Sequence, residues 1–226
     1  MSVIFGNHAD LPKNDSDPAQ WNYQRYLSPF QIEKFTYMFE TFFDCENHDG
    51  FIQKGDVVEL LEKIRLYCDL KEDDARYLRM VDILYAFYDC LMEQVKIEVA
   101  QTQFAQGFDS WSEALKPHNI KSDNISLNQW LNMWGKLCYG AAGISGFPIW
   151  VQLLGHLFFD TIDRDGDGVC SIEELKNFYK GVIGVDAENL TKVTTEGYRA
   201  LTAVSFMSRD SQIVSNQNFY RVTNTS

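Results

Sequence analysis

Apolar residues recur at helical spacing along most of this chain, whereas the alternation typical of strands is short and rare. The first helix is expected to begin after Ser28, since Ser28 can cap it, Pro29 suits its first position and Gln31 completes a capping box. Its apolar positions then follow at Ile32, Phe35, Phe39, Phe42 and Phe43. We therefore expect an all-α fold.

The same spacing predicts further helices downstream. The second carries its apolar face at Val57, Leu60, Leu61 and Ile64. The longest pattern fades near Gly107 and runs through Leu78, Val81, Leu84, Tyr85, Tyr88, Leu91, Met92, Val95 and Val99. A loop is expected over 107–124. The next helix is marked by Trp130, Met133, Trp134 and Leu137.

A glycine-rich stretch from Gly140 to Pro148 divides the chain into two predicted halves. We expect a mobile N-terminal arm at 1–27, a first pair of helix-loop-helix units at 28–139, a linker at 140–148 and a second pair at 149–226. The second half repeats the plan, with a helix ending near Ile162, a loop, and a helix carrying Leu175, Phe178 and Tyr179. Two weaker helices are expected around 187–203 and 216–223.

The loop from Asp163 to Glu174 fits the calcium-loop pattern D-x-[DN]-x-[DN]-G-x5-E at every fixed position. Calcium takes about six to eight oxygen ligands, and Gly168 supplies the sharp turn that brings them together. Three aspartates within five residues repel one another without a cation, so a purely solvated charge run is a poor explanation. The expected ligands are the side chains of Asp163, Asp165, Asp167 and Glu174, the carbonyl of Val169, and a water or hydroxyl at Ser171.

A second candidate loop runs from Asp44 to Asp56, and its register is ambiguous. Counting back from Gly50 makes Cys45 the first ligand, and a neutral thiol is a poor calcium ligand. Helix phase favours Asp44 instead, because phenylalanines lie one, five and nine places before it. The same offsets hold apolar residues before Asp163, namely Ile162, Phe158 and Leu154.

The resulting hypothesis is a thirteen-residue loop that binds metal through Asp44, Asn47, Asp49, the Phe51 carbonyl and Asp56. Because its last ligand is the shorter Asp, Mg²⁺ is expected to compete with Ca²⁺ there. The alternative is a loop kept only for folding. The chain is thus expected to bind one or two calcium ions.

Two further loops have the helix phase of a calcium loop without its ligands. The segment from His118 to Gln129 places His118, Ile120 and Gln129 at ligand positions, and a last loop around 208–218 has Asp210 but neither glycine nor closing acid. Such loops work in pairs. We therefore expect Ile52 to pair with Ile125, and Cys170 with Val214, in two short strand ribbons.

The charge and cysteine content of the chain indicate which binding partners and which cellular compartment suit it. A net charge of -12 and a pI of about 4.7 disfavour binding to nucleic acid or anionic membrane and favour calcium ions. No apolar run approaches the roughly 20 residues that span a bilayer, and no secretory signal is evident. The five cysteines form no CxxC pair, which suits a reducing compartment. We expect a cytoplasmic monomer.

These features together resemble the sarcoplasmic calcium-binding protein and calexcitin family of EF-hand proteins. The resemblance rests on the run from Phe43 to Gly50, which looks like calexcitin's first loop with Glu46 inserted, and on the Trp130–Trp134 helix. It extends from about Ser28 to the C-terminus. It implies two lobes of paired hands, with the second and fourth hands degenerate, and a calcium and magnesium buffer or a neuronal signalling protein.

Three functional alternatives follow from this resemblance. A buffer keeps its core closed, whereas a sensor exposes an apolar groove for an unidentified protein target. Sensor grooves favour methionine, and here methionines are scattered while aromatic residues dominate, which favours the buffer. Related photoproteins enclose a luciferin, and His156 beside Trp150 and Phe158 could line such a cavity. No catalytic or nucleotide-binding motif is present, so we expect no enzyme.

Overall fold

The computed structural model describes residues 22–105, 124–139, 141 and 144–184. This part of the chain is helical apart from one two-stranded ribbon, which confirms the predicted fold class. The strands are β1 (Phe51–Ile52) and β2 (Ile125–Ser126). The helices are η2 (Tyr23–Tyr26), α1 (Pro29–Met38), η3 (Phe39–Phe43), α2 (Lys54–Tyr67), α3 (Ala75–Ala105), α5 (Leu127–Cys138), η4 (Ile144–Gly146), α6 (Ile149–Ile162), α7 (Ile172–Phe178) and η5 (Tyr179–Ile183).

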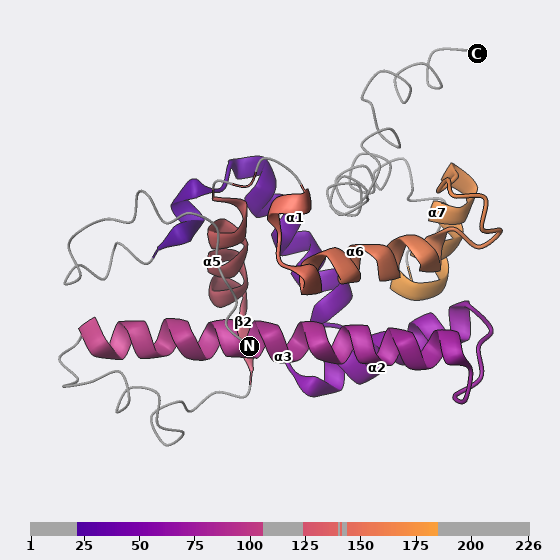
Figure 1. The fold of residues 1–226 in the computed structure, drawn as a ribbon, viewed down its shortest axis with the longest axis horizontal. Helices are drawn as coiled ribbons and strands as arrows, with labels where there is room; N and C mark the ends of the chain where they lie inside the picture. The colour runs from indigo at the N-terminus through magenta and orange to yellow at the C-terminus, as the bar shows by residue number, and fades with distance from the viewer. Residues whose placement is uncertain (1–21, 106–123, 140, 142–143, 185–226) are drawn as a thin grey trace, which may run out of the picture.

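Helix α3 runs along the described body, with α6 packed beside it and α5 crossing it (Figure 1). The capping box predicted at the start of α1 is present, since Ser28 N–H donates to Gln31 Oε1 at 2.9 Å and Gln31 N–H donates to Ser28 Oγ at 3.2 Å. The predicted apolar faces of α2 and α5 are buried. The face predicted for α3 is only partly buried, because Leu78 is 50% exposed near its first turn.

One aromatic core joins the first and third helix-loop-helix units. Phe42 of η3 lies 5.3 Å from Phe158 of α6 and 6.1 Å from Phe178 of α7, measured between ring centroids. Trp130 of α5 packs on Phe43 at 5.1 Å and donates its indole N–H to the carbonyl of Phe35. Rings from units far apart in sequence therefore fill a continuous interior.

The two strands form the ribbon that the sequence predicts. They are antiparallel, and Ile52 pairs with Ile125 while Phe51 pairs with Ser126. Both isoleucines are buried, so the pairing carries apolar contact as well as hydrogen bonds between the first and second loops. The partner predicted for Cys170, Val214, lies outside the described residues.

Two segments that we assigned to the arm and the linker contribute to the packed body. Tyr23 and Leu27, from the segment predicted as the N-terminal arm, are buried, and Tyr23 N–H donates to Asn132 Oδ1 of α5 at 2.6 Å. Phe147, from the predicted linker, packs on Trp134 at 6.4 Å. The body therefore begins before Ser28 and includes part of the glycine-rich stretch.

Several predictions concern residues outside the described part of the chain. They are the arm at 1–21, most of the loop at 107–124 with His118 and Ile120, the helices at 187–203 and 216–223, and the loop around Asp210.

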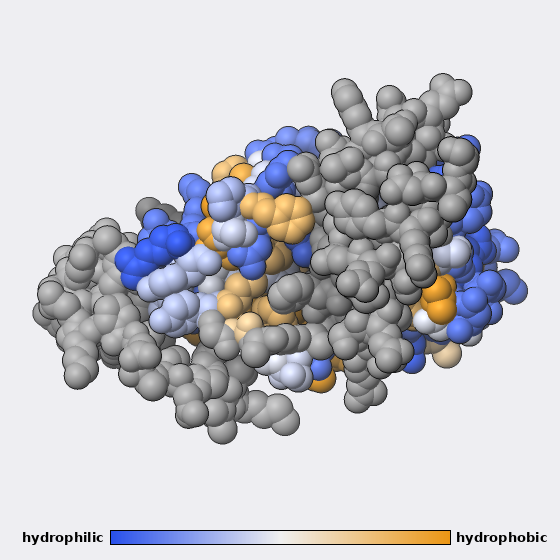
Figure 2. Space-filling view, turned by 90° about the horizontal axis from the view of Figure 1, so that it is seen from above, coloured by the Kyte–Doolittle hydropathy of each residue, from blue (hydrophilic) through white to orange (hydrophobic). Residues whose placement is uncertain are grey.

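On the face drawn in Figure 2, apolar side chains gather in the middle of the described surface and hydrophilic ones lie towards its ends. The exposed apolar residues of α6 are Ile149 and Leu153.

Candidate metal centre

The loop between α6 and α7 begins at Asp163, which is 8% exposed and directly follows the last turn of α6. Its Oδ1 accepts the N–H of Gly166 at 2.9 Å, and its Oδ2 accepts the N–H of Gly168 at 3.0 Å. Both glycines have positive φ, 72° and 84°, which an L side chain adopts only at a cost. The glycines thus allow the loop backbone to curl around the Asp163 carboxylate.

Glu174 closes this loop from the first turn of α7. Its Oε2 accepts the N–H of Ser171 at 2.9 Å, and its Oε1 accepts the N–H groups of Arg164 at 2.8 Å and Asp165 at 3.4 Å. These donors, Ser171 first, lower the pKa of the Glu174 carboxyl below its ordinary value. Glu174 therefore stays ionised and joins the two ends of the loop.

Three carboxylates converge in this loop. One oxygen from each of Asp163, Asp165 and Glu174 lies within 4.8 Å of the others, a spacing that a single cation could bridge. Asp167 is not in this group, and its Oδ1 accepts the N–H of Val169 at 2.7 Å. Ser171 donates its hydroxyl to Glu174 Oε2 at 2.8 Å. The ligand roles of Asp167, Val169 and Ser171 stay predictions.

The loop between η3 and α2 resembles the later loop at its first residue, because Asp44 and Asp163 each accept the N–H of the turn glycine and of one other loop residue. Asp44 is 4% exposed, its Oδ1 accepts the N–H of Asp49 at 3.1 Å, and its Oδ2 accepts that of Gly50 at 2.9 Å. The bond from the leading aspartate to the turn glycine spans six residues here and five in the later loop. This geometry places Asp44, rather than Cys45, at the start of the loop, with one extra residue before Gly50.

The middle of the first loop also matches its counterpart. Asn47 Oδ1 accepts the N–H of Asp49 at 3.1 Å, as Asp165 Oδ1 accepts that of Asp167 at 3.1 Å. Asp49 Oδ1 accepts the N–H of Phe51 at 2.9 Å, as Asp167 does for Val169. His48 has φ 53°, at the place where the later loop has Gly166. The predicted residues therefore lie in the order and backbone setting of a metal loop.

The closing residues of the two loops each accept three backbone N–H groups but differ in burial. Asp56 is 2% exposed and accepts three backbone N–H groups, from Cys45 at 2.9 Å, Glu46 at 2.9 Å and Gln53 at 2.8 Å. The sequence did not predict the donors at Cys45 and Glu46. They are backbone N–H groups, which nearly every residue type has, so the residue types give no sign of them. Asp56 thus already has several hydrogen-bond partners within the loop.

The carboxylates of the first loop do not gather as those of the later loop do. Among the residues that the structure describes, no second trio of acidic, cysteine or histidine side chains approaches as closely as Asp163, Asp165 and Glu174. Asp49 Oδ2 instead accepts the side-chain amide of Gln53 at 2.7 Å. A metal at this loop would need Asp49 to exchange that bond for a metal bond.

The structure describes the second loop from Asn124 onward. Its closing residue, Gln129, keeps the hydrogen bond that closes the loop but carries no negative charge. Gln129 Oε1 accepts the N–H of Ser126 at 2.9 Å, the bond that Glu174 makes to Ser171. An amide at this position brings only one neutral oxygen where a calcium loop has a bidentate carboxylate. The degeneracy of the second loop stays a prediction.

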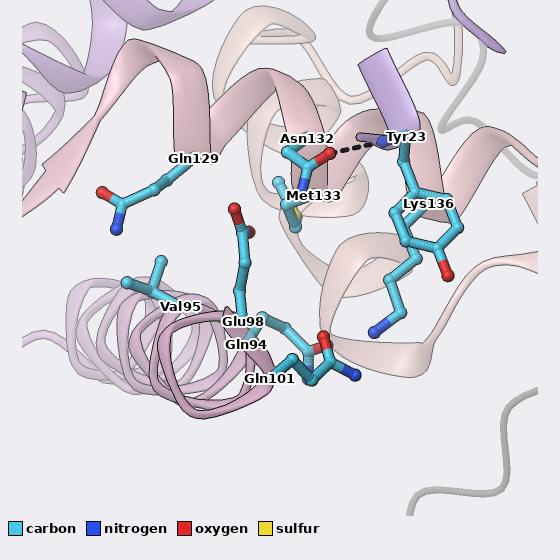
Figure 3. A pocket seen from close by; sticks show the side chains of 9 residues that line it. All are labelled: Tyr23, Gln94, Val95, Glu98, Gln101, Gln129, Asn132, Met133 and Lys136. Carbon is cyan, nitrogen blue, oxygen red and sulfur yellow. Dashed lines mark hydrogen bonds between the residues drawn. The ribbon is translucent and has the colours of Figure 1, made fainter. Parts of the chain in front are cut away.

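A separate pocket lies between α3 and α5 (Figure 3). Its lining is largely polar and consists of Tyr23, Gln94, Val95, Glu98, Gln101, Gln129, Asn132, Met133 and Lys136. Burial raises the pKa of Glu98 and lowers that of Lys136. The pocket contains none of His156, Trp150 and Phe158, the residues suggested for a luciferin cavity. Phe158 packs instead against Phe42 in the core.

None of the described helices combines the length and apolar character needed to cross a membrane.

Comparison with known proteins places these loops in context. Over 155 residues the chain is 27% identical to the sarcoplasmic calcium-binding proteins II, V, VI and VII of Branchiostoma lanceolatum, covering 68% of this chain and 71% of theirs. Identity and coverage are the same for proteins I, III and IV of that organism. A solved sarcoplasmic calcium-binding protein from amphioxus aligns with a TM-score of 0.50 and 23% identity, over 80% of this chain and 91% of that one.

No protein-family model matches the chain. The structural likeness carries the fold, and the two sequence matches extend across most of both chains. The sequence similarity to sarcoplasmic calcium-binding proteins and the likeness to their fold together support an assignment of the chain to that EF-hand family.

Proposed function

We propose that this chain binds calcium, with its principal site in the loop from Asp163 to Glu174. The observation that carries the proposal is the convergence of Asp163, Asp165 and Glu174, whose oxygens lie within 4.8 Å of one another. Three carboxylates so close repel one another, and a divalent cation relieves that repulsion. Asp167, the Val169 carbonyl and Ser171 complete the proposed ligand set.

The loop from Asp44 to Asp56 is the proposed second site. Its support is the matched backbone cradle around Asp44 and the matched turns at Asn47 and Asp49. The shorter Asp56 favours one-oxygen, six-fold coordination, which suits Mg²⁺ as well as Ca²⁺. Binding at this site is expected to be weaker, because Asp49 must leave the Gln53 amide before it can bind a cation.

We propose a buffer rather than a sensor. The supporting observation is the interlocked core, in which Phe42 contacts both Phe158 and Phe178. A groove between the first and third hands could open only by separating these rings and exposing their apolar area, at roughly 25 cal/mol per Å². A binding role without catalysis, a cytoplasmic location, a monomeric state and a division into paired-hand halves at 28–139 and 149–226 belong to the same proposal.

Calorimetry tests the two sites directly. Calcium is titrated into the metal-free chain with and without millimolar magnesium, for wild type, Glu174→Gln and Asp49→Ala. Glu174→Gln should abolish the tighter site, and magnesium should compete at the other, which Asp49→Ala should remove. Glu173→Gln is the matched control, because Glu173 is exposed and precedes Glu174 directly. Stoichiometry unchanged by Asp49→Ala would leave the first loop with a folding role alone.

A second measurement separates buffer from sensor. An apolar dye that fluoresces in exposed hydrophobic grooves should bind equally to the metal-free and calcium-loaded chain if the core stays closed. A large calcium-dependent rise in dye binding would contradict the buffer and favour a sensor that grips a target helix.

A further inference from the structure

The second residue of the Asp163 loop contacts the other half of the molecule. The guanidinium of Arg164 lies over the ring of Tyr67, 5.2 Å from its centroid. Tyr67 is the last residue of α2, the helix that leaves the first loop. Among the described residues Arg164 forms no ion pair, although it sits between two aspartates. Its side chain therefore lies on an aromatic face and not on the loop carboxylates.

The Tyr67 ring is held by packing. It lies edge-on to Phe178 of α7, with centroids 5.8 Å apart and planes at 83°. Gly181 is so close that an added Cβ would stand 2.5 Å from Cδ2 of the ring. The Tyr67 hydroxyl is buried and has no hydrogen-bond partner, so no polar contact determines where the ring sits. The ring is a fixed surface on which the guanidinium rests.

The beginning of α3, just after the turn that follows α2, contacts the end of α6, just before the same loop. Arg76 donates to the carbonyl of Asp160, and Arg79 pairs with the Asp160 carboxylate at 3.1 Å. Asp160 lies in the last turn of α6, which leads into Asp163. Figure 1 shows this turn and the α6–α7 loop at the same end of the described body. Two side-chain contacts thus connect the α2–α3 hairpin to the beginning of the loop.

We propose that Tyr67 is a positioning residue for the calcium site between Asp163 and Glu174. By holding the Arg164 guanidinium on its ring, it keeps a positive charge from pairing with the carboxylates that should receive the cation. It also steadies the Arg164 backbone, whose N–H donates to Glu174 Oε1 at 2.8 Å. This inference rests on the proposed calcium site and adds a specific residue, from the other half of the chain, on which its affinity depends.

The central test is calcium affinity at this loop in Tyr67→Leu. Loss of the ring frees Arg164 to compete, and the dissociation constant should rise by about 3- to 30-fold, the range of a cation–π contact. Arg164→Gln added to Tyr67→Leu should recover most of that loss, because the competing charge is gone. Tyr67→Phe keeps the ring and should rescue affinity, since the hydroxyl has no partner.

Tyr85→Leu is the matched control. It removes another ring that carries a cation, Lys54 at 5.5 Å, and should leave the Asp163 loop unaffected. Tyr67→Met is prepared alongside Tyr67→Leu because Met fills more of the space that the ring vacates. Urea unfolding of the metal-free variants shows whether each is folded before its titration is interpreted.

The outcomes separate this inference from the proposed function. A wild-type chain that binds no calcium refutes both. Wild-type binding that Tyr67→Leu leaves unchanged refutes the positioning role alone. A loss that Arg164→Gln does not recover, or variants Tyr67→Leu and Tyr67→Met that are both unfolded, would make Tyr67 a packing residue and overturn the inference.

Discussion

In both candidate loops the leading aspartate accepts two backbone N–H groups, yet the loops close on different side chains. Asp44 and Asp163 each hold a turn glycine with positive φ, Gly50 and Gly168. At the other end, Asp56 and Glu174 each accept three backbone N–H groups, but Asp56 is 2% exposed, whereas Glu174 is only half-buried and its carboxylate meets those of Asp163 and Asp165. Hydrogen bonds close both loops, and among the described residues the acids gather closely only in the later one.

The difference indicates that the same loop plan can serve two purposes. In the first loop the buried acid is a structural acceptor, because leaving its N–H donors unpartnered in the interior is costly. In the later loop the acids are gathered, partly open to solvent, and suited to a cation. The first loop should therefore matter most to folding and the later loop most to calcium affinity.

The largest expected effect is on the stability of the metal-free chain. Asp56→Ala leaves three N–H groups without their acceptor and should lower the free energy of unfolding by about 2–4 kcal/mol. Glu174→Ala should cost less than about 1 kcal/mol, since Glu174 is only half-buried and water can take over its bonds to the N–H groups. Urea unfolding in a chelator measures both, with exposed Asp73→Ala as a control expected within about 0.5 kcal/mol. Equal losses in the two loops would contradict the comparison.

The next effect is on ion selectivity. Glu174→Asp shortens the closing side chain to the length of Asp56 and should remove its two-oxygen contact with the ion. Calcium affinity should then fall by about tenfold or more, and magnesium affinity should fall less. The later loop would then bind ions as we propose for the first. Competition titrations with both ions measure the ratio, and Glu173→Asp serves as the control. A calcium preference that persists in Glu174→Asp would mean that the closing residue does not set it.

A smaller effect concerns the backbone at the equivalent turn positions. His48 has φ 53° where the later loop has Gly166 at φ 72°. His48→Gly should stabilise the metal-free chain by about 0.5–1 kcal/mol through relief of strain, and Gly166→Ala should destabilise it by about 1 kcal/mol. No atom lies within 4 Å of an added Cβ at Gly166, so backbone conformation alone would cause that loss. Thermal unfolding in a chelator measures both, and a destabilising His48→Gly would disprove the equivalence.

The smallest effect is on acid titration of the later loop. The N–H donors around Glu174, Ser171 first, lower its pKa from the model-peptide value of 4.5. Because the folded-state pKa is lowered, this interaction stabilises the metal-free chain above pH 4.5 and is lost as pH falls through the lowered pKa. The amide NMR signals of Ser171 and Arg164 should titrate together below pH 4.5. A midpoint at or above 4.5 would show that these donors do not hold the carboxylate.

Much of the first half of the fold follows from local signals. The Ser28 capping box, the buried faces of α2 and α5 and the pairing of Ile52 with Ile125 all appear as predicted. Helix phase also predicted Asp44 as the first loop residue, because apolar positions before a loop must face the core in either hand. These features depend on residue type and spacing, which a sequence displays directly.

Contacts between distant segments were decided only by the tertiary structure. Three contacts bring together residues from different elements. They are the N–H donors on Asp56, the Arg164 guanidinium on the Tyr67 ring, and the packing of Phe42 on Phe178. Backbone N–H groups carry no mark of residue type, and the position of an aromatic residue in the sequence does not show which cation will lie over its face. The sequence therefore determined which loops carry oxygen-bearing side chains at the spacing of a calcium loop, while the packing of helices determined how these side chains are held.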